Sequence, residues 1–275
     1  MRVADAVRAA AEALREGRQP ETARLDAELL AAHLLHIDRS ALLLSPDGKI
    51  DRAAYDALIA RRRAGEPLAY IVGKAEFWSL TFAVTPDVLI PRADSEVLIE
   101  TALRRTSRPP AEVLDLGTGS GCLLLATLTE FPDAAGLGID QSDSALSIAR
   151  RNAAALGLKD RADFRRGNWT DGLTDRFDLI LCNPPYVDEV RELGPGVREY
   201  EPGAALFADE AGLADYRELM PRIAAHLTLD GLALVELGAG QTADVRAFVE
   251  ASGLVVDAVE RDLAGHERAL TLRPA

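Results

Sequence analysis

The chain has 275 residues, 48% of them hydrophobic, and 44 acidic against 31 basic residues give it a formal net charge of −13. This length accommodates one full α/β domain and a smaller one, and the composition is that of an ordinary globular protein. A protein that binds nucleic acid nonspecifically needs a basic surface, so the acidic balance argues against nucleic acid as the direct substrate. The longest basic run, Arg61–Arg63, is expected to be the solvated last turn of a helix.

The sequence has no segment with the apolar length that a membrane-spanning helix needs, and Arg2, Asp5 and Arg8 interrupt the place of a signal-peptide core. Two cysteines, Cys122 and Cys182, are too few for a disulfide framework and are expected to be buried packing residues. The four histidines show no zinc-ligand spacing. We therefore expect a reduced, cytoplasmic setting, no membrane partner and no metal.

The N-terminal part, residues 1–68, is expected to be a small helical domain. Apolar residues recur at helical spacing over 3–14 and over 25–34, and Ser45–Gly48 is expected to be a turn. Asp51 can cap a further helix that runs to Arg63. Residues 69–92 are expected to link this domain to the next as a β-hairpin. Apolar residues alternate with others in this segment, at Phe77, Leu80, Phe82 and Val84. This alternation predicts a strand pair between Tyr70 and Ile90.

From residue 93 to residue 275, apolar runs alternate with helical patterns, as in a doubly wound, mostly parallel α/β sheet. Strands are expected at 112–116, 134–139, 161–165, 177–182, 231–237 and 254–259. The segment 187–203 is the most irregular part of this domain. Loops of that length are usually functional or disordered.

The motif Asn183-Pro184-Pro185-Tyr186 directly follows the apolar strand at 177–182. Two successive prolines cannot continue a ladder, so Asn183 lies at the carboxyl end of a strand, where open α/β sheets bind ligands. The Asn183 oxygen can accept one N–H of a planar amine or amide, and the carbonyl of Pro184 can accept the other. Tyr186 offers a flat face to the same group. These parts suit an acceptor nitrogen held for group transfer, and an ordinary Pro-rich loop is the alternative.

A glycine loop, Gly117-Thr118-Gly119-Ser120-Gly121, lies between the strand at 112–116 and a helix that starts at Cys122. Such a turn lets a ligand approach the N–H groups of a helix N-terminus, although the glycine spacing is not that of dinucleotide-binding folds. Asp140 ends the next strand and can accept hydrogen bonds from two ribose hydroxyls. The alternative for Asp140 is a helix cap. The three motifs together favour a ligand site.

These motifs resemble the PrmC/HemK family of class I S-adenosylmethionine-dependent methyltransferases, and the resemblance covers nearly the whole chain. Further matching stretches are Gly65–Gly73, Glu76–Trp78, Leu89–Glu96, Tyr200–Pro202, Ala205–Ala208, Gly212–Leu213 and Tyr216–Arg217. The family usually has Pro-Arg-Pro-Asp-Thr-Glu where this chain has Pro91-Arg92-Ala93-Asp94-Ser95-Glu96. Ser95 keeps the hydroxyl of that threonine.

The resemblance implies a Rossmann-like, seven-stranded sheet whose last segment, near Ala269–Leu272, is antiparallel. It implies methyl transfer from S-adenosyl-L-methionine, giving S-adenosyl-L-homocysteine, to the side-chain amide nitrogen (N5) of the glutamine in the GGQ motif of class I peptide chain release factors. It also implies that the N-terminal helices and segment 187–203 receive the release factor.

The resemblance assigns residues to each role. Catalysis falls to Asn183, Pro184 and Tyr186, and substrate binding to these three and Pro185. The cofactor would contact Gly117, Thr118, Gly119, Ser120, Gly121, Asp140, Trp169 and Asn183. Trp169 matches the segment that contacts adenine in the family, and core packing is its alternative.

Three other functions remain open. A ribosomal-protein glutamine methyltransferase of the PrmB type is similar, but the stretches 65–73 and 76–78 match PrmC better. An N6-adenine or N4-cytosine nucleic-acid methyltransferase shares the Asn-Pro-Pro-Tyr chemistry, but the net charge weighs against it. A non-catalytic module that binds release factors is disfavoured because the glycine loop, Asp140 and the Asn-Pro-Pro-Tyr motif are all intact.

Overall fold

The computed structural model describes residues 1–44, 47–262 and 264–275, so Ser45 and Pro46 of the predicted turn lie outside the described residues. The chain forms two compact units. The first contains residues 1–74 and 192–201, and the second contains residues 75–191 and 202–275. The chain therefore leaves the first unit, returns to it for a short segment and leaves it again.

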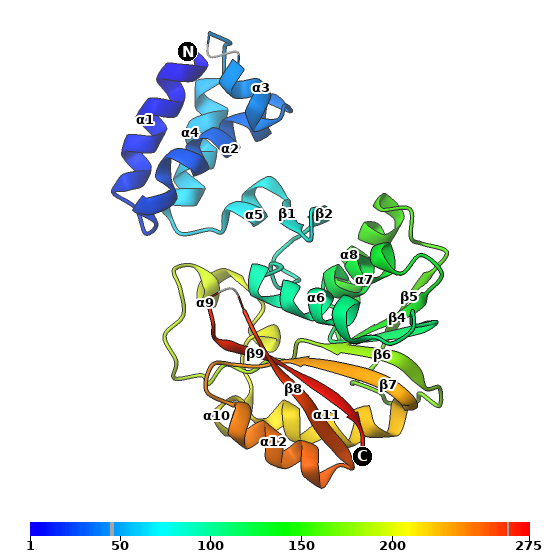
Figure 1. The fold of residues 1–275 in the computed structure, drawn as a ribbon. Helices are drawn as coiled ribbons and strands as arrows, with labels where there is room; N and C mark the ends of the chain where they lie inside the picture. Colours follow the sequence, from blue (N-terminus) through cyan, green and yellow to red (C-terminus); the bar gives the residue numbers. More distant parts are fainter. Residues whose placement is uncertain (45–46, 263) are drawn as a thin grey trace. The chain divides into compact units, whose positions relative to one another are not determined.

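The first unit is helical, as the sequence predicts (Figure 1). Its main helices are α1 (Val3–Arg15), α2 (Ala23–Leu35), α3 (Arg39–Leu44), α4 (Arg52–Arg63) and α5 (Leu68–Val72). Their apolar faces form a separate core that includes Leu14, Leu30 and Tyr55. The predicted cap of α4 is confirmed, because the Asp51 side chain accepts a hydrogen bond from the Ala54 N–H at 3.2 Å. No described helix of the chain is long and apolar enough to cross a membrane.

The prediction of a solvated basic turn at the end of α4 is wrong for Arg62. Arg61 and Arg63 are exposed, but Arg62 is buried and lies 2.7 Å from the Asp26 carboxylate. Its guanidinium also donates to the Glu66 carbonyl at 3.0 Å. A buried charge is tolerated only when it is paired and hydrogen-bonded, and these contacts supply both conditions. Arg62 is therefore an internal residue of the first unit, and loss of Arg62 or Asp26 alone would leave an unpaired buried charge.

Segment 192–201 belongs to the first unit through specific contacts. It contains the short helix α9 (Val197–Tyr200). Glu199 forms an ion pair with Arg18 at 2.6 Å, and the Gln19 amide donates to the Pro195 carbonyl at 3.3 Å. At Gly196, a Cβ atom would lie 2.2 Å from the backbone oxygen of Gly65, so only glycine fits this approach.

The second unit is built on a seven-stranded sheet with the order β5-β4-β3-β6-β7-β9-β8. The strands are β3 (Glu112–Leu116), β4 (Ala135–Asp140), β5 (Ala162–Arg166), β6 (Phe177–Cys182), β7 (Leu227–Glu236), β8 (Leu254–Arg261) and β9 (Glu267–Pro274). The first five are parallel, and β9 is antiparallel to β7 and β8. The predicted doubly wound fold and its antiparallel last strand are confirmed. β7 begins at Leu227, earlier than the predicted 231.

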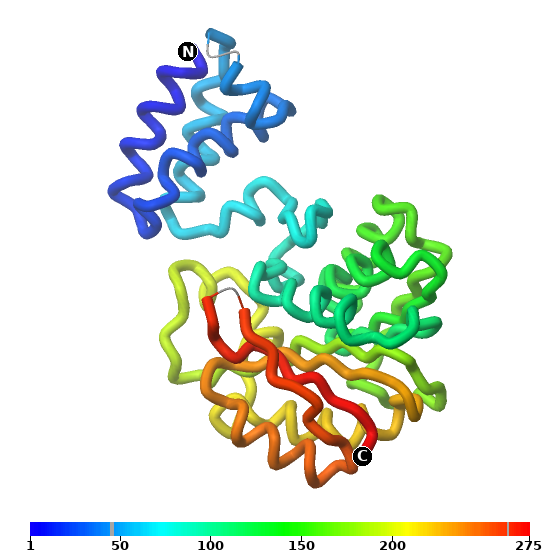
Figure 2. The backbone as a smooth tube through the Cα atoms, in the orientation of Figure 1, coloured from blue at the N-terminus to red at the C-terminus, as the bar shows by residue number. Residues whose placement is uncertain are grey.

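Helices cover both faces of the sheet (Figures 1 and 2). One face carries α6 (Glu96–Arg105), α7 (Cys122–Glu130) and α8 (Asp143–Ala155), and the other carries α11 (Ala214–His226) and α12 (Thr242–Ala251). Central strands are therefore buried on both sides and read as continuous apolar runs. Along β3, Val113 enters one core and Leu114 enters the other.

The predicted strand pair is shorter than expected, because Leu68–Val72 forms α5 and the hairpin comprises only β1 (Lys74–Phe77) and β2 (Leu80–Ala83). The side chain of Asn152, in α8, holds β2 in place by two hydrogen bonds to the backbone of Ala83. Its Oδ1 accepts from the Ala83 N–H at 2.7 Å and its Nδ2 donates to the Ala83 carbonyl at 3.1 Å. Nδ2 also donates to the Ser120 carbonyl at 2.8 Å, so the hairpin and the glycine loop share one buried support.

Candidate functional site

The carboxyl ends of the central strands bring the predicted motifs into one row. Leu116 of β3 is in register with Ile139 of β4 and with Cys182 of β6, and Cys182 is in register with Val235 of β7. The residues that follow these four therefore lie side by side at the same edge of the sheet. They are Asp140, Gly117, Asn183 and Glu236.

The glycine loop is packed on one side and open on the other. Gly117, Gly119 and Gly121 have φ values of 71°, 54° and 79°, a region that side chains disfavour. A Cβ at Gly117 would lie 3.4 Å from the Trp169 ring, whereas at Gly119 the nearest atom, 3.9 Å away, is the Gly117 oxygen. Thr118 and Ser120, between the glycines, are buried. Gly117 is exposed and Gly119 is half-buried, so the backbone at these two glycines is the accessible part of the loop.

Asp140 faces this loop from the end of β4. Its Oδ2 accepts the Gly119 N–H at 2.9 Å, and its Oδ1 accepts the Ser142 N–H at 2.9 Å. The cap of α8 is Ser142, whose hydroxyl accepts the Ala145 N–H at 3.2 Å, so the alternative role of Asp140 as the helix cap is wrong. Each carboxylate oxygen has a second lone pair, which leaves both oxygens able to accept a hydroxyl group.

The Asn-Pro-Pro-Tyr motif sits on a buried hydrogen-bond network. The Asn183 Nδ2 donates to the Ser95 hydroxyl at 3.2 Å, and that hydroxyl donates to the Glu236 Oε2 at 2.5 Å. The Tyr186 hydroxyl donates to the other Glu236 oxygen at 3.1 Å. Pro184 is buried and Pro185 is half-buried between them. One carboxylate therefore anchors both polar side chains of the motif.

Sequence reasoning missed Glu236 and gave Ser95 no role. The available signal was a glutamate inside the apolar run of β7, where an unpaired charge would be costly. Burial raises the pKa of Glu236 to about 7, while hydrogen bonds from Ser95 and Tyr186 and the positive charge of Arg268 oppose the rise. A titratable group of this kind at a ligand edge is typical of functional sites.

Known proteins match the chain over nearly its full length. A PrmC N-terminal domain model matches residues 5–73, and a methyltransferase small domain model matches residues 93–195. A release factor glutamine methyltransferase from Cereibacter sphaeroides is 44% identical, with 99% of this chain and 99% of that protein covered. The corresponding protein of Vibrio cholerae is 43% identical, with 96% and 93% covered. This chain belongs to the release factor glutamine methyltransferase family.

Two further comparisons agree with this family. A release factor glutamine methyltransferase from Rhodospirillum rubrum is 42% identical, with 92% of this chain and 79% of that protein covered. The crystal structure of a methyltransferase from Pyrococcus furiosus matches with a TM-score of 0.55, covering 79% of this chain and 96% of the other at 16% identity. At that identity, the likeness shows a shared fold.

Trp169 of the methyltransferase is a core residue on the side that faces the glycine loop. It is 7% exposed, lies in the same core cluster as Leu116 and Ile139, and has a φ of 52°. Its ring is the nearest side chain to the position of a Cβ on Gly117. Core packing, the alternative raised by the sequence, is therefore present, and an adenine contact stays a prediction.

Gln241 and Gly212 hold the backbone of the loop that follows Asn183. The Gln241 side chain donates to the Tyr186 carbonyl at 3.1 Å and accepts the Gly238 N–H at 3.1 Å. At Gly212, whose φ is 85°, a Cβ would lie 2.2 Å from the same Tyr186 oxygen. Glycine is required there, and these contacts leave the tyrosine backbone little freedom.

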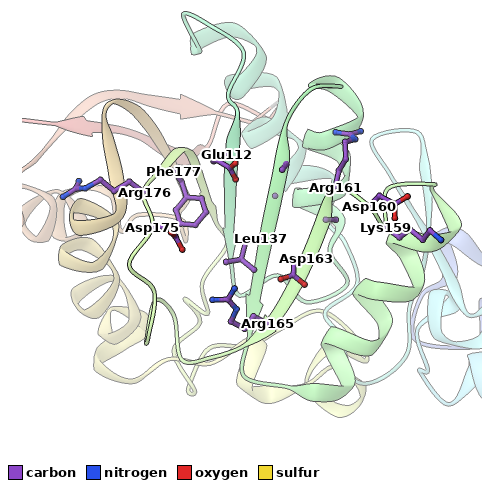
Figure 3. A pocket seen from close by; sticks show the side chains of 13 residues that line it. Glu112, Leu137, Lys159, Asp160, Arg161, Asp163, Arg165, Asp175, Arg176 and Phe177 are labelled. Carbon is purple, nitrogen blue, oxygen red and sulfur yellow. The ribbon is translucent and has the colours of Figure 1, made fainter.

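A cleft of about 690 Å³ lies at the amino-terminal ends of the parallel strands of the methyltransferase, opposite the carboxyl ends that carry the candidate site (Figure 3). Its lining includes the first residues of four parallel strands, Glu112, Ala135, Ala162 and Phe177. Most of the remaining lining is a mixture of acidic and basic side chains, such as Asp163 and Arg165, and Gly136 and Leu137 complete it. None of the predicted site residues lines this cleft, so it is separate from the candidate active site.

The described part of the chain contains no group of three or more His, Cys, Asp and Glu side chains arranged to hold a metal ion. Both cysteines are free; Cys182 is buried as expected, whereas Cys122 is half-buried. Burial raises the pKa of the Cys122 thiol to about 12 and that of Cys182 well above its usual range. Thiols are reactive as thiolates, so both cysteines are expected to be inert packing residues.

The buried carboxyl of Asp115 predicts that the stability of the methyltransferase decreases with pH. Burial raises its pKa from an ordinary 3.8 to about 7, although the Thr118 hydroxyl donates to it at 2.6 Å. Between these values the folded state keeps a proton that the unfolded state releases, so stability falls as pH rises through about 7. A rise from 3.8 to about 7 corresponds to on the order of 4 kcal/mol as an upper bound.

Asp115→Asn keeps the acceptor for Thr118 and removes the titration. The free energy of unfolding, measured by urea denaturation at pH 5 and pH 8, should fall less in this variant than in the wild type. Asp143→Asn, at an exposed position on α8, is the matched control and should keep the wild-type dependence. An equal decrease in the wild type and in Asp115→Asn would contradict the assignment to Asp115.

Proposed function

We propose that this protein transfers a methyl group from S-adenosyl-L-methionine to the side-chain amide nitrogen (N5) of the glutamine in the GGQ motif of class I peptide chain release factors. The observation that carries this proposal is the 44% identity, over 99% of both chains, to a relative named release factor glutamine methyltransferase. The partners are then class I release factors, and the reaction needs no nucleic-acid substrate.

The residues at the carboxyl edge fit S-adenosylmethionine. The open backbone near Gly119 can receive the methionine and ribose parts, and Asp140 has one lone pair left on each oxygen for the two ribose hydroxyls. Trp169 would lie beside the adenine ring. The cofactor supplies a methyl group on a positively charged sulfur, which is a strong electrophile.

The chain's own residues would orient the acceptor. An amide nitrogen is a poor nucleophile, because its lone pair is delocalised into the carbonyl. The Asn183 Oδ1 and the Pro184 carbonyl would each accept one of its N–H bonds, and Tyr186 would cover its flat face. These acceptors favour the positive charge that develops on nitrogen. Positioning of this kind can supply roughly 7–11 kcal/mol. The acceptor nitrogen would take the methyl group as the methyl–sulfur bond breaks, which leaves S-adenosyl-L-homocysteine, and it would release one proton to solvent water and remain a neutral amide.

We also propose that different parts of the chain have different roles. Residues 1–68 would recognise the release factor, residues 69–92 would link the domains, and residues 93–275 would bind the cofactor and catalyse transfer. The match of residues 5–73 to the PrmC N-terminal domain supports the first assignment. Segment 192–201, which follows the Asn-Pro-Pro-Tyr motif in the chain, folds with those helices and would join them in recognition.

The proposal is tested by peptide mapping of a class I release factor after incubation with the protein and S-adenosylmethionine. One added methyl group on the GGQ glutamine is expected. Ribosomal proteins and DNA or RNA serve as parallel substrates. Methylation of one of these, with none on the release factor, would replace the proposed function by one of the two alternatives that share the Asn-Pro-Pro-Tyr chemistry.

A further inference from the structure

The Ser95 hydroxyl lies between the side chains of Asn183 and Glu236 and bonds to both. It is 3.2 Å from the Asn183 Nδ2 and 2.5 Å from the Glu236 Oε2. Ser95 is 3% exposed and Glu236 is 1% exposed, so water does not compete for the contact between them, and Asn183 is half-buried. Ser95 comes from the turn before α6, Asn183 from the end of β6 and Glu236 from the end of β7.

Hydrogen counting fixes the direction of these bonds. An ionised carboxylate only accepts, and a hydroxyl has a single proton to give. Ser95 gives its proton to Glu236, so its oxygen can only accept from Asn183. The reversed amide would place the Asn183 Oδ1 against an oxygen with no proton left. A buried acceptor without a donor costs about 1–3 kcal/mol, which favours Nδ2 facing Ser95.

We infer that Glu236, acting through Ser95, fixes which end of the Asn183 amide faces the acceptor and so makes the site select a group that presents N–H bonds. Both are positioning residues, and the inference rests on the proposed function because it concerns the same acceptor. A glutamine side chain is nearly symmetric in shape, with nitrogen on one branch and oxygen on the other. An Oδ1 facing the acceptor binds the nitrogen branch and disfavours the oxygen branch.

The other partners of Glu236 keep it in the acceptor role. The Tyr186 hydroxyl donates to its Oε1 at 3.1 Å, so each carboxylate oxygen receives one proton from a hydroxyl. The positive charge of Arg268 favours its ionised form and the negative charge of Asp94 opposes it. The Tyr216 hydroxyl donates to the backbone carbonyl of Glu236 at 3.0 Å, which holds the end of β7 in place.

Glu236→Gln tests the inference, because a glutamine whose Oε1 keeps the Tyr186 proton turns its Nε2 to Ser95, gives a proton to the serine oxygen and frees the serine proton for the Asn183 Oδ1. Asn183 would then reverse and present its NH₂ to the acceptor. Measurements at pH 8, above the pKa of about 7, keep the wild-type carboxylate ionised. We expect turnover on the GGQ release factor to fall roughly 10- to 100-fold, which is the scale for a misplaced group and not for a removed one, because Asn183 stays in the site but faces the wrong way.

The decisive measurement is the binding of a release factor whose GGQ glutamine is replaced by glutamate. The wild-type Oδ1 repels that carboxylate, whereas the reversed amide of Glu236→Gln donates to it. We therefore expect the glutamate form to bind about 10-fold tighter to the variant than to the wild type, the opposite of the effect on the glutamine form. A general loosening of the site would weaken both.

Ser95 variants carry the same test if Glu236→Gln does not fold. Ser95→Ala removes the link and should lower turnover by roughly 10-fold or more while the affinity for S-adenosylhomocysteine, measured by calorimetry, stays within about 2-fold. Ser95→Thr keeps the hydroxyl and should retain near wild-type turnover. Ser252→Ala is the matched control, since the Ser252 hydroxyl donates to the Val249 carbonyl at 2.7 Å within its own helix end.

Two outcomes would overturn the inference while the proposed function stands. The first is wild-type methylation of the release factor with unchanged turnover in Ser95→Ala and Glu236→Gln. The second is a loss of S-adenosylhomocysteine affinity in parallel with turnover, which would mark a merely structural role. A wild-type protein that does not methylate the release factor would instead overturn the proposed function. The binding comparison between the glutamine and glutamate forms needs no turnover and still tests the inference.

Discussion

Asn183→Ala is expected to lower turnover of release factor methylation by about two to three orders of magnitude, the usual loss for one preorganised polar group at a reacting centre. Alanine removes the Oδ1 that would hold one N–H of the acceptor amide. It also leaves the Ser95 oxygen without its donor, which at present lies 3.2 Å away. Initial rates of methyl transfer at saturating cofactor give the turnover number.

The control for Asn183→Ala is the affinity for S-adenosylhomocysteine, measured by calorimetry. The cofactor would be bound chiefly by the glycine loop and Asp140, so this affinity should survive in large part. Turnover equal to that of the wild type would show that Asn183 does not hold the acceptor. A complete loss of cofactor affinity would mean that the substitution damages the row of strand ends as a whole.

Asp140→Ala is expected to weaken the binding of S-adenosylmethionine by about 100-fold or more. A hydrogen bond to a charged group contributes about 1.5–3 kcal/mol, and two ribose hydroxyls would each lose one. The substitution also frees the Gly119 N–H, which Asp140 now accepts at 2.9 Å, so the loop loses part of its support. Isothermal titration with the cofactor measures the effect.

Asp143→Asn is the matched control for Asp140→Ala. Asp143 lies three positions further along the chain, is exposed and contacts Arg166 at 3.0 Å. Its replacement should leave cofactor affinity unchanged. If Asp140→Ala also bound the cofactor with wild-type affinity, the ribose assignment would have to be abandoned.

Local sequence patterns predict the sheet and the residues at its edge. A parallel strand buried on both faces is a short apolar run, and the residue that follows such a run lies at the ligand edge. Asn183 and Asp140 can therefore be placed without any knowledge of their neighbours. The same reasoning is weaker where elements are short. The pattern predicts a strand at Tyr70, but this residue belongs to the five-residue helix α5. Alternation over a few residues does not distinguish a strand from a short helix.

Long-range pairing sets the limit of such reasoning. Ser95 and Glu236 bond across 141 positions, and no local pattern links a serine before a helix to a glutamate in a strand. Arg62 looks like a surface cation until Asp26, 36 positions earlier, is placed beside it. In each case the partner follows from the packing of elements that are distant in sequence. The burial of Glu236 and of Arg62 follows from the same packing, and it makes a partner for each charge necessary.

The interleaving of the two units constrains how genes of this family can exchange parts. A crossover near residue 74 would bring in foreign helices but keep the native segment 192–201. That segment would then meet substitutes for Arg18, Gln19 and Gly65, its present partners. A functional chimera therefore needs two more breakpoints, one on each side of segment 192–201. The helical unit and this segment should be inherited together.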